Sequence, residues 1–147
     1  MSKSAHASAL EIFSCETQKK LPLPLYLSKV RAGFPSPADD YLDKKLDLND
    51  HLIKNPAATF FVKVAGNSMI NAGIKTGDLL IVDRSLEPKD KKIVVAIIEG
   101  EFTVKRILKK GDKLYLAPEN DTFAPIEITE EMDFQVWGVI TSVIHAV

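Results

Sequence analysis

From residue 59 onward, the alternation of hydrophobic and polar residues predicts a chain built mainly of β-strands. Short runs rich in β-branched and aromatic residues recur there, separated by turn residues. The predicted strands are Thr59–Val64, Asp78–Asp83, Ile93–Glu99, Glu101–Leu108, Lys113–Ala117 and Phe134–Val143. Gly100 and the pair Gly111-Asp112 lie between such runs, as is typical of β-hairpins. The pattern therefore favours a small, curled, mainly antiparallel β fold.

The N-terminal part of the chain follows a different pattern. Asp47 can cap one short helix that runs to about Asn55. Residues 1–32 show no sustained period of hydrophobic positions, although a short helical segment can form around residues 10–13. The prolines in residues 21–25 then force an extended path, because each proline also restricts the residue before it. We expect an extended N-terminal arm that cannot build a core of its own.

Composition limits the classes of protein to which the chain can belong. It has 147 residues, of which 46% are hydrophobic and 27% charged, which suits one folded domain with a tail. It contains no run of about 18 apolar residues, so we expect no membrane span. The first 20 residues lack the apolar stretch of a secretory signal, which makes a cytoplasmic location the expectation.

The same composition argues against metal and cofactor sites. Cys15 is the single cysteine, so an internal disulfide is excluded. With only three scattered histidines, the chain cannot supply the ligands of a structural zinc site. We therefore predict neither a metal nor a cofactor.

Charge is unevenly distributed along the chain. The formal net charge is −1, but residues 1–32 hold five basic and two acidic groups. The remainder holds 14 basic and 18 acidic groups. An acidic body argues against direct, sequence-specific DNA binding, which needs a basic face to neutralise phosphates.

A serine after the first predicted strand is a candidate functional residue. Ser68 stands in Gly66-Asn67-Ser68-Met69, just beyond that strand. At such a place, backbone N–H groups can converge on an anion. The alternative is an ordinary turn serine that hydrogen-bonds its own backbone.

A lysine on a later predicted strand is the second candidate. Strand alternation puts Lys105 and Arg106 on opposite faces, so one of the two points into a partly apolar setting. A lysine that acts as a base near neutral pH must lose about three units from its reference pKa of about 10.4, at a cost of roughly 4 kcal/mol of desolvation. Serine activated by a neutral lysine is a known form of nucleophilic catalysis. The alternative is a solvated lysine.

The histidines and one peptide bond complete the candidates. His6, His51 and His145 have no motif around them, so none is expected to act as the base. The bond Ala32-Gly33 joins two small residues and precedes a proline-rich stretch that stays extended, as a protease substrate does. The same features also suit a plain linker bend.

Together these motifs resemble the LexA/UmuD family of self-cleaving serine peptidases, and within it the UmuD-like branch. The resemblance covers about residues 31–147. Six blocks in the same order carry it: Gly33-Phe34-Pro35-Ser36-Pro37-Ala38, Asp47-Leu48-Asn49, Ala58-Thr59-Phe60-Phe61-Val62-Lys63, Gly66-Asn67-Ser68-Met69, Gly77-Asp78-Leu79-Leu80-Ile81-Val82-Asp83 and Gly100-Glu101-Phe102-Thr103-Val104-Lys105.

The resemblance implies a catalytic arrangement and two parts of the chain. Ser68 would be the nucleophile and Lys105 the general base, with an oxyanion hole made by the backbone N–H groups of Asn67 and Ser68. Self-cleavage of Ala32-Gly33 would then separate a flexible arm, residues 1–32, from a serine–lysine peptidase domain, residues 33–147. The resemblance also implies a homodimer.

It further implies partners in the SOS response to DNA damage. Cleavage in this family is slow until a filament of RecA on single-stranded DNA binds. The trimmed dimer then serves as accessory subunit to the catalytic subunit of an error-prone, Y-family translesion polymerase.

The sequence departs from the family pattern at two positions. Asn67 stands where UmuD-like sequences often have an acidic residue, and the expected cut is Ala-Gly, as in the repressor branch, rather than Cys-Gly. A repressor is disfavoured, because 32 residues before the cut are too few for a helix-turn-helix domain. One other function stays open, a non-catalytic β-rich interaction module with an unused dyad. A peptidase that cuts other proteins is disfavoured, because the chain carries its own plausible substrate bond.

Overall fold

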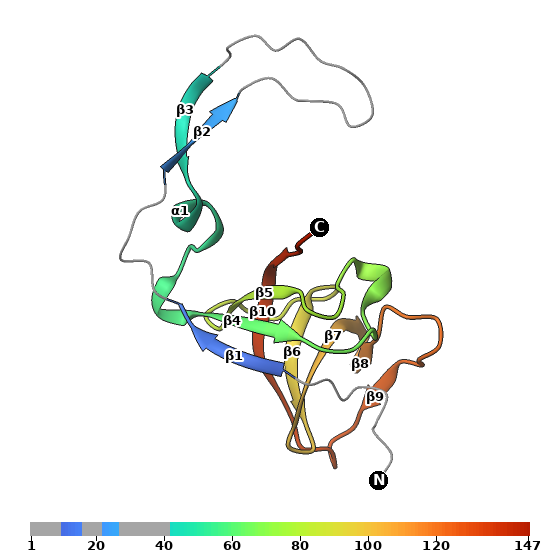
Figure 1. Ribbon diagram of the computed structural model, residues 1–147. Helices are drawn as coiled ribbons and strands as arrows, with labels where there is room; N and C mark the ends of the chain where they lie inside the picture. The colour runs from blue at the N-terminus through green and yellow to red at the C-terminus, as the bar shows by residue number, and fades with distance from the viewer. Residues whose placement is uncertain (1–9, 16–21, 27–41) are drawn as a thin grey trace. The chain divides into compact units, whose positions relative to one another are not determined.

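The computed structural model describes residues 10–15, 22–26 and 42–147, which belong to two compact units (Figure 1). The larger unit combines the N-terminal strand β1 with residues 55–147. The smaller unit lies within residues 16–54. Each unit is described separately.

The smaller unit holds a two-stranded sheet and one short helix. Strand β2 (Pro22–Tyr26) pairs antiparallel with β3 (Leu42–Asp47), and helix α1 (Leu48–Leu52) follows directly. The Asp47 side chain accepts a hydrogen bond of 2.9 Å from the Asn49 backbone N–H, which is the predicted N-cap. The helix ends earlier than predicted, and β3 was not predicted.

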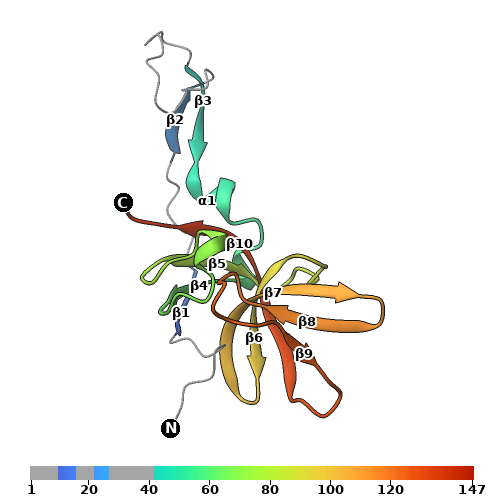
Figure 2. The ribbon, with the colours of Figure 1, turned by 90° about the vertical axis from the view of Figure 1, so that its right-hand side faces the viewer.

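The larger unit is built on one eight-stranded antiparallel sheet in the order β1-β4-β5-β10-β6-β7-β8-β9. Its strands are β1 (Leu10–Ser14), β4 (Thr59–Val64), β5 (Leu79–Asp83), β6 (Ile93–Ile98), β7 (Glu101–Lys110), β8 (Lys113–Ala117), β9 (Ile126–Ile128) and β10 (Phe134–Ile144). The mainly β, antiparallel fold predicted from the sequence is confirmed, and six strands lie close to their predicted ranges. Figure 2 shows β7 and β8 running side by side to their hairpin.

One prediction about the N-terminal segment was wrong. Residues 10–14 form strand β1 rather than a scrap of helix, with Leu10 opposite Val64 and Ser14 opposite Phe60 of β4. A segment this short cannot hold a helix by itself, because helix nucleation is costly. Pairing with the edge of β4 instead satisfies the backbone groups of β1.

Two bulges bend the long strand β10 as it crosses the sheet. The register with β6 shifts between Val136 and Gly138, and the register with β5 shifts between Ile140 and Ser142. A β-carbon at Gly138 would come within 2.5 Å of the Val82 side chain, so this close approach requires glycine. The bulges give the sheet the curl that the short strands predicted.

The core of the larger unit lies on both faces of β6. On one face, Val95 packs with Val62, Leu80 and Val104. On the other, Val94, Ala96 and Ile98 pack with Ile107, Leu116 and Val139. Strand β6 is therefore apolar throughout, as expected for a central strand. The predicted hairpin after β6 is present, with positive φ angles at Glu99 (49°) and Gly100 (79°).

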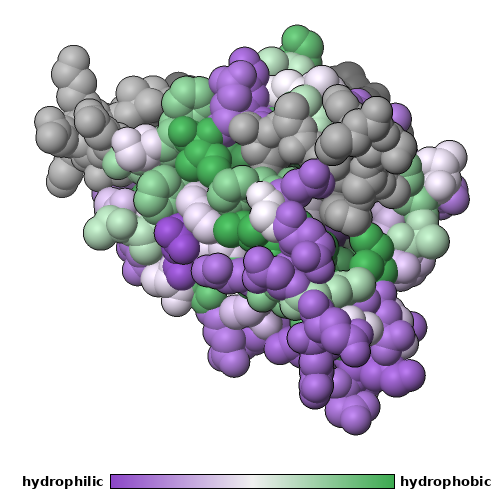
Figure 3. Space-filling view, turned by 90° about the horizontal axis from the view of Figure 1, so that it is seen from below, coloured by the Kyte–Doolittle hydropathy of each residue, from purple (hydrophilic) through white to green (hydrophobic). Residues whose placement is uncertain are grey.

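The face of the molecule drawn in Figure 3 is mixed in polarity. On the face seen in Figure 3, small apolar patches alternate with polar residues instead of merging into one broad area. In the part of the chain that the structure describes, no helix has the length and apolar character needed to cross a membrane.

Candidate active site

Ser68 lies in the loop that joins β4 to β5, which we call the Ser68 loop (residues 65–78). Gly66 has a φ of 108°, a conformation that favours glycine, and lets the chain turn sharply after β4. The Thr76 hydroxyl then closes the loop, because it accepts from the Gly66 N–H (3.0 Å) and donates to the Gly66 carbonyl (2.9 Å). Within this loop, Ser68 is only 8% exposed.

Lys105 lies in the middle of β7 and is completely buried. Its exposed fraction is 0%, whereas Arg106, on the opposite face, is partly exposed. Of the two candidates left open by the strand pattern, it is therefore Lys105 that points inward. Directly across the ladder from Lys105 stands Val94 of β6, a core residue.

The fold brings Ser68 and Lys105 together although 37 residues separate them in sequence. The Lys105 Nζ lies 3.3 Å from the Ser68 Oγ, which is within reach of a proton transfer. It also donates to the Thr103 Oγ1 (2.7 Å) and to the Val104 carbonyl (3.1 Å).

Burial lowers the pKa of the Lys105 ammonium from 10.5 to about 8, because a charged group loses its hydration inside the protein. A substantial fraction of the amine is therefore neutral in mildly alkaline solution. A neutral amine has a lone pair that can accept the serine proton, which an ammonium lacks. The arrangement is chemically able to activate a serine.

Thr103 is a site residue that the sequence reasoning missed. It is fully buried, and its hydroxyl lies closer to the Lys105 Nζ than the serine does. The available signal was its position two residues before Lys105, on the same face of the strand.

Replacing Thr103 with valine should slow serine activation without unfolding the chain. The substitution keeps the shape but removes the hydroxyl that orients the amine, so we expect any Ser68-dependent cleavage to fall about 10-fold. Cleavage rates of Thr103→Val and Thr103→Ser, compared with the parent by denaturing electrophoresis, measure this. Thr103→Ser should retain most of the rate, and a full rate in Thr103→Val would contradict the assignment.

The backbone around Ser68 offers donors for a negatively charged oxygen. Among the residues that the structure describes, the N–H groups of Asn67 and Ser68 have no hydrogen-bond acceptor. The Asn67 carbonyl, in contrast, accepts from the Ile70 N–H (3.2 Å) and from the Asn120 side chain (2.8 Å). Two free donors beside the serine hydroxyl are what an oxyanion hole needs.

His145, the described histidine of the larger unit, takes no part in this site. His51 lies on α1, and the His145 Nδ1 is 2.6 Å from a carboxylate oxygen of Asp78, which is 2% exposed. Hydrogen bonds lower the pKa of Asp78 although its burial alone would raise it. His6 lies outside the described residues, as do Ala32 and Gly33, so the cleavage site remains a sequence-based prediction. Within the described ranges, no cluster of His, Cys, Asp and Glu could hold a metal ion.

Comparison with known proteins decides the family. A family model described as peptidase S24-like matches residues 24–141. The chain belongs to the peptidase S24-like family. Protein ImpA of Salmonella typhimurium is 46% identical over 126 residues, which cover 83% of this chain and 83% of ImpA. MucA of Escherichia coli is 42% identical over 120 residues, which cover 81% of this chain and 82% of MucA.

The peptidase S24-like relatives also locate the chain within the family. ImpA and MucA are UmuD-like members of the LexA/UmuD family, so the resemblance drawn from six sequence blocks is confirmed. The LexA repressor of Shewanella denitrificans is 42% identical over 113 residues, which cover 77% of this chain but only 54% of the repressor. This peptidase S24-like chain thus shares a domain with the repressor rather than its whole length.

Proposed function

We propose that the chain is a self-cleaving serine peptidase in which Ser68 attacks its own Ala32-Gly33 bond with Lys105 as general base. The observation that carries the proposal is the contact of 3.3 Å between the Ser68 Oγ and a buried Lys105 Nζ whose pKa is lowered to about 8. Membership of a family of self-cleaving peptidases supports the same reading.

Acylation begins with a proton transfer inside the dyad. The neutral Lys105 amine takes the proton of the Ser68 hydroxyl while the Oγ bonds to the Ala32 carbonyl carbon. The carbonyl oxygen becomes an oxyanion, which the backbone N–H groups of Asn67 and Ser68 stabilise. When the intermediate collapses, the Ala32-Gly33 bond breaks and the Lys105 ammonium gives its proton to the Gly33 nitrogen.

Deacylation repeats the cycle with water as the nucleophile. The first step leaves an ester between the Ser68 Oγ and the Ala32 carbonyl carbon. Lys105 is neutral again, so it can take a proton from a water that attacks the ester. When the ester bond breaks, the Lys105 ammonium gives that proton to the Ser68 Oγ, which restores the dyad. The products are an arm that ends in a carboxyl group at Ala32, which ionises in water, and a domain that begins with the Gly33 amine.

The substrate is within reach of the active site in principle. Gly33 and Ser68 are 35 residues apart, and because β3, α1 and β4 take up part of this segment, it spans less than the roughly 110 Å of a fully extended chain. Tethering also gives the bond an effective concentration on the order of millimolar. Docking of the bond over Lys105, rather than encounter, therefore controls the rate.

The wider role extends the proposal to partners. We propose that a RecA filament on single-stranded DNA stimulates the cleavage in the cytoplasm. The trimmed homodimer then assists the catalytic subunit of a Y-family translesion polymerase during SOS mutagenesis. The UmuD-like relatives support this role.

Purified full-length chain should cleave itself without any filament at raised pH. We expect a fragment whose N-terminal sequence begins at Gly33, detected by Edman sequencing and intact mass. A chain that stays intact both at pH 9.5 and with the filament would favour the non-catalytic interaction module. Mixing active protein with a tagged Ser68→Ala copy tests cleavage of other molecules.

The rate of self-cleavage should follow the titration of Lys105. Because only the neutral amine acts as a base, the rate should rise about 10-fold per pH unit below pH 8 and level off above it. Filament-free rates between pH 6 and pH 10, at constant ionic strength, measure the profile. A rate that keeps rising to pH 10 would show a lysine of ordinary pKa and contradict the mechanism.

A further inference from the structure

The loop between β8 and β9, here called the Glu119 loop (residues 118–125), contacts the Ser68 loop on both sides of the serine. Before the serine, the Asn120 side-chain amide donates to the Asn67 carbonyl (2.8 Å). After it, the Asn71 N–H donates to the Glu119 carbonyl (2.7 Å), and the Glu119 N–H lies 3.4 Å from the Met69 sulfur. Ser68 is thus flanked by residues that a second loop holds.

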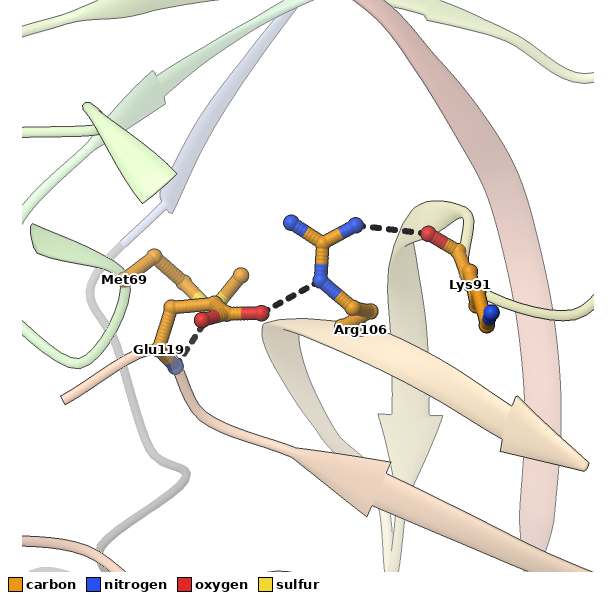
Figure 4. Close-up of polar contacts among 4 residues, drawn as sticks. All are labelled: Met69, Lys91, Arg106 and Glu119. Carbon is orange, nitrogen blue, oxygen red and sulfur yellow. Dashed lines mark hydrogen bonds and ion pairs between the residues drawn. The ribbon is translucent and has the colours of Figure 1, made fainter. Parts of the chain in front are cut away.

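Arg106 connects the Glu119 loop to the strand that carries Lys105. Figure 4 shows its guanidinium between the Glu119 carboxylate and the backbone oxygen of Lys91. The Arg106 Nε donates a hydrogen bond to the Glu119 Oε1 and forms an ion pair with it, and the Nη1 donates to the Lys91 backbone oxygen (2.6 Å). The bond to Lys91 holds the planar guanidinium in place, so the single Nε bond can fix the position of Glu119.

The orientation of Asn120 is fixed as well. Its side-chain oxygen accepts from the Thr122 N–H (2.9 Å) and from the Thr122 hydroxyl (2.7 Å). This leaves the amide group of Asn120 aimed at the Asn67 carbonyl. The Glu119 loop is therefore ordered by its own contacts and by Arg106.

We propose that Arg106 and Glu119 are positioning residues for Ser68, which act through the Glu119 loop. Lys105 and Arg106 are adjacent on β7 and point to opposite faces. The Lys105 side chain contacts the serine hydroxyl directly, and the Arg106 side chain holds the loop that contacts residues on both sides of the serine. A single strand thereby sets the position of both partners, and the peptide N–H groups of Asn67 and Ser68 with them. The inference rests on the proposed role of Ser68 as nucleophile.

A double-mutant cycle tests the proposal in the full-length chain. Arg106→Ala and Glu119→Ala should each slow filament-free cleavage about 10-fold, because small misplacements of a nucleophile are costly. The double variant should also lose about 10-fold rather than 100-fold, since both changes remove one interaction. Arg106→Lys should recover part of the rate. Parent rates in the single variants, or a 100-fold loss in the double variant, would overturn the proposal.

Two further readouts separate positioning from general destabilisation. In the Arg106→Ala and Glu119→Ala variants, the midpoint of the pH–rate profile should stay near pH 8 while the plateau rate falls. The Arg106–Glu119 pair acts on the Ser68 loop and leaves the Lys105 amine buried. A midpoint shifted toward that of an ordinary lysine would contradict this. The matched control is the exposed pair Lys113–Glu127, whose charged atoms are 3.9 Å apart on neighbouring strands. Its double alanine variant should cleave at the parent rate.

Hydrogen exchange tests the coupling between the Glu119 loop and the Ser68 loop without relying on cleavage. In a Ser68→Ala background, Glu119→Ala should speed amide exchange at residues 70–74 at least several-fold, with β6 amides unchanged. If the parent does not cleave while exchange responds in this way, the proposed function fails but the coupling between the loops stands. If the parent cleaves and neither exchange nor rate responds, the positioning role alone is overturned.

Discussion

Ser68→Ala and Lys105→Ala should each abolish self-cleavage, with rates at least about 10⁴-fold below the parent. Without the hydroxyl there is no nucleophile, and without the amine nothing near the serine can take its proton. In the described part of the larger unit, no histidine contacts Ser68 as a second base. The disappearance of intact chain at pH 9.5 and with the filament, followed by mass spectrometry, measures the loss.

Matched substitutions show whether the loss is specific. Ser85→Ala removes a hydroxyl that bonds to Asp83 away from the dyad, and it should cleave at the parent rate. Lys63→Met removes an exposed lysine on β4 and should also be silent. Persistent cleavage at Gly33 in Ser68→Ala would mean that this dyad is not the catalyst.

Lys105→Met should make the protein inactive yet more stable at neutral pH, by about 2 kcal/mol in the free energy of unfolding. A pKa lowered from 10.5 to about 8 corresponds to a penalty of roughly 3 kcal/mol for holding the charged amine inside the fold. Methionine avoids the penalty at similar volume. It leaves the buried Thr103 hydroxyl without this partner, which costs about 1 kcal/mol.

The stability that Lys105→Met gains should fall as the pH rises. Because the folded pKa of Lys105 lies below the unfolded one, the unfolded chain binds more protons between about pH 8 and pH 10.5. The contribution of Lys105 to stability therefore rises with pH through this window, and its penalty is complete below it. The advantage of Lys105→Met should shrink steadily as the pH rises from 8 toward 10.5.

Urea unfolding at pH 7 and pH 9.5 checks both the size and the sign. Ser68→Ala is the background, so that cleavage does not interfere at alkaline pH. Lys63→Met, which removes an exposed lysine on β4, serves as the control, and its effect should be the same at both pH values. A methionine variant less stable than its background at pH 7, or an advantage that grows with pH, would refute the burial penalty.

The strands could be predicted from the sequence because local signals specify them, whereas the pairing of Ser68 with Lys105 was an expectation that the family resemblance supplied. Alternation and glycine turns marked β4 to β8 and β10, and strand alternation limited the buried cation to Lys105 or Arg106. The choice between the two depends on which face of β7 meets the core, which is a property of the curled sheet. The contact of 3.3 Å between residues 37 positions apart depends on the same curl.

Features set by non-local pairing were not predictable in this way. Strand β1 forms because β4 offers an edge for pairing, whereas the sequence of β1 shows no clear helical or strand period. Thr103 and the Arg106–Glu119 pair look like ordinary strand and loop residues in the sequence. Their roles arise from contacts across the ladder and between loops. The single charge on Glu119 gives no sign that it supports the serine loop.

The most direct test of the account is the titration of the Lys105 side chain in intact Ser68→Ala protein, followed by NMR of its labelled ε-carbon. We predict a midpoint near pH 8 for Lys105, and the same midpoint in the Lys63→Met variant. A midpoint above pH 10 would mean that the amine stays charged at physiological pH. Lys105 could then not serve as the base that activates Ser68.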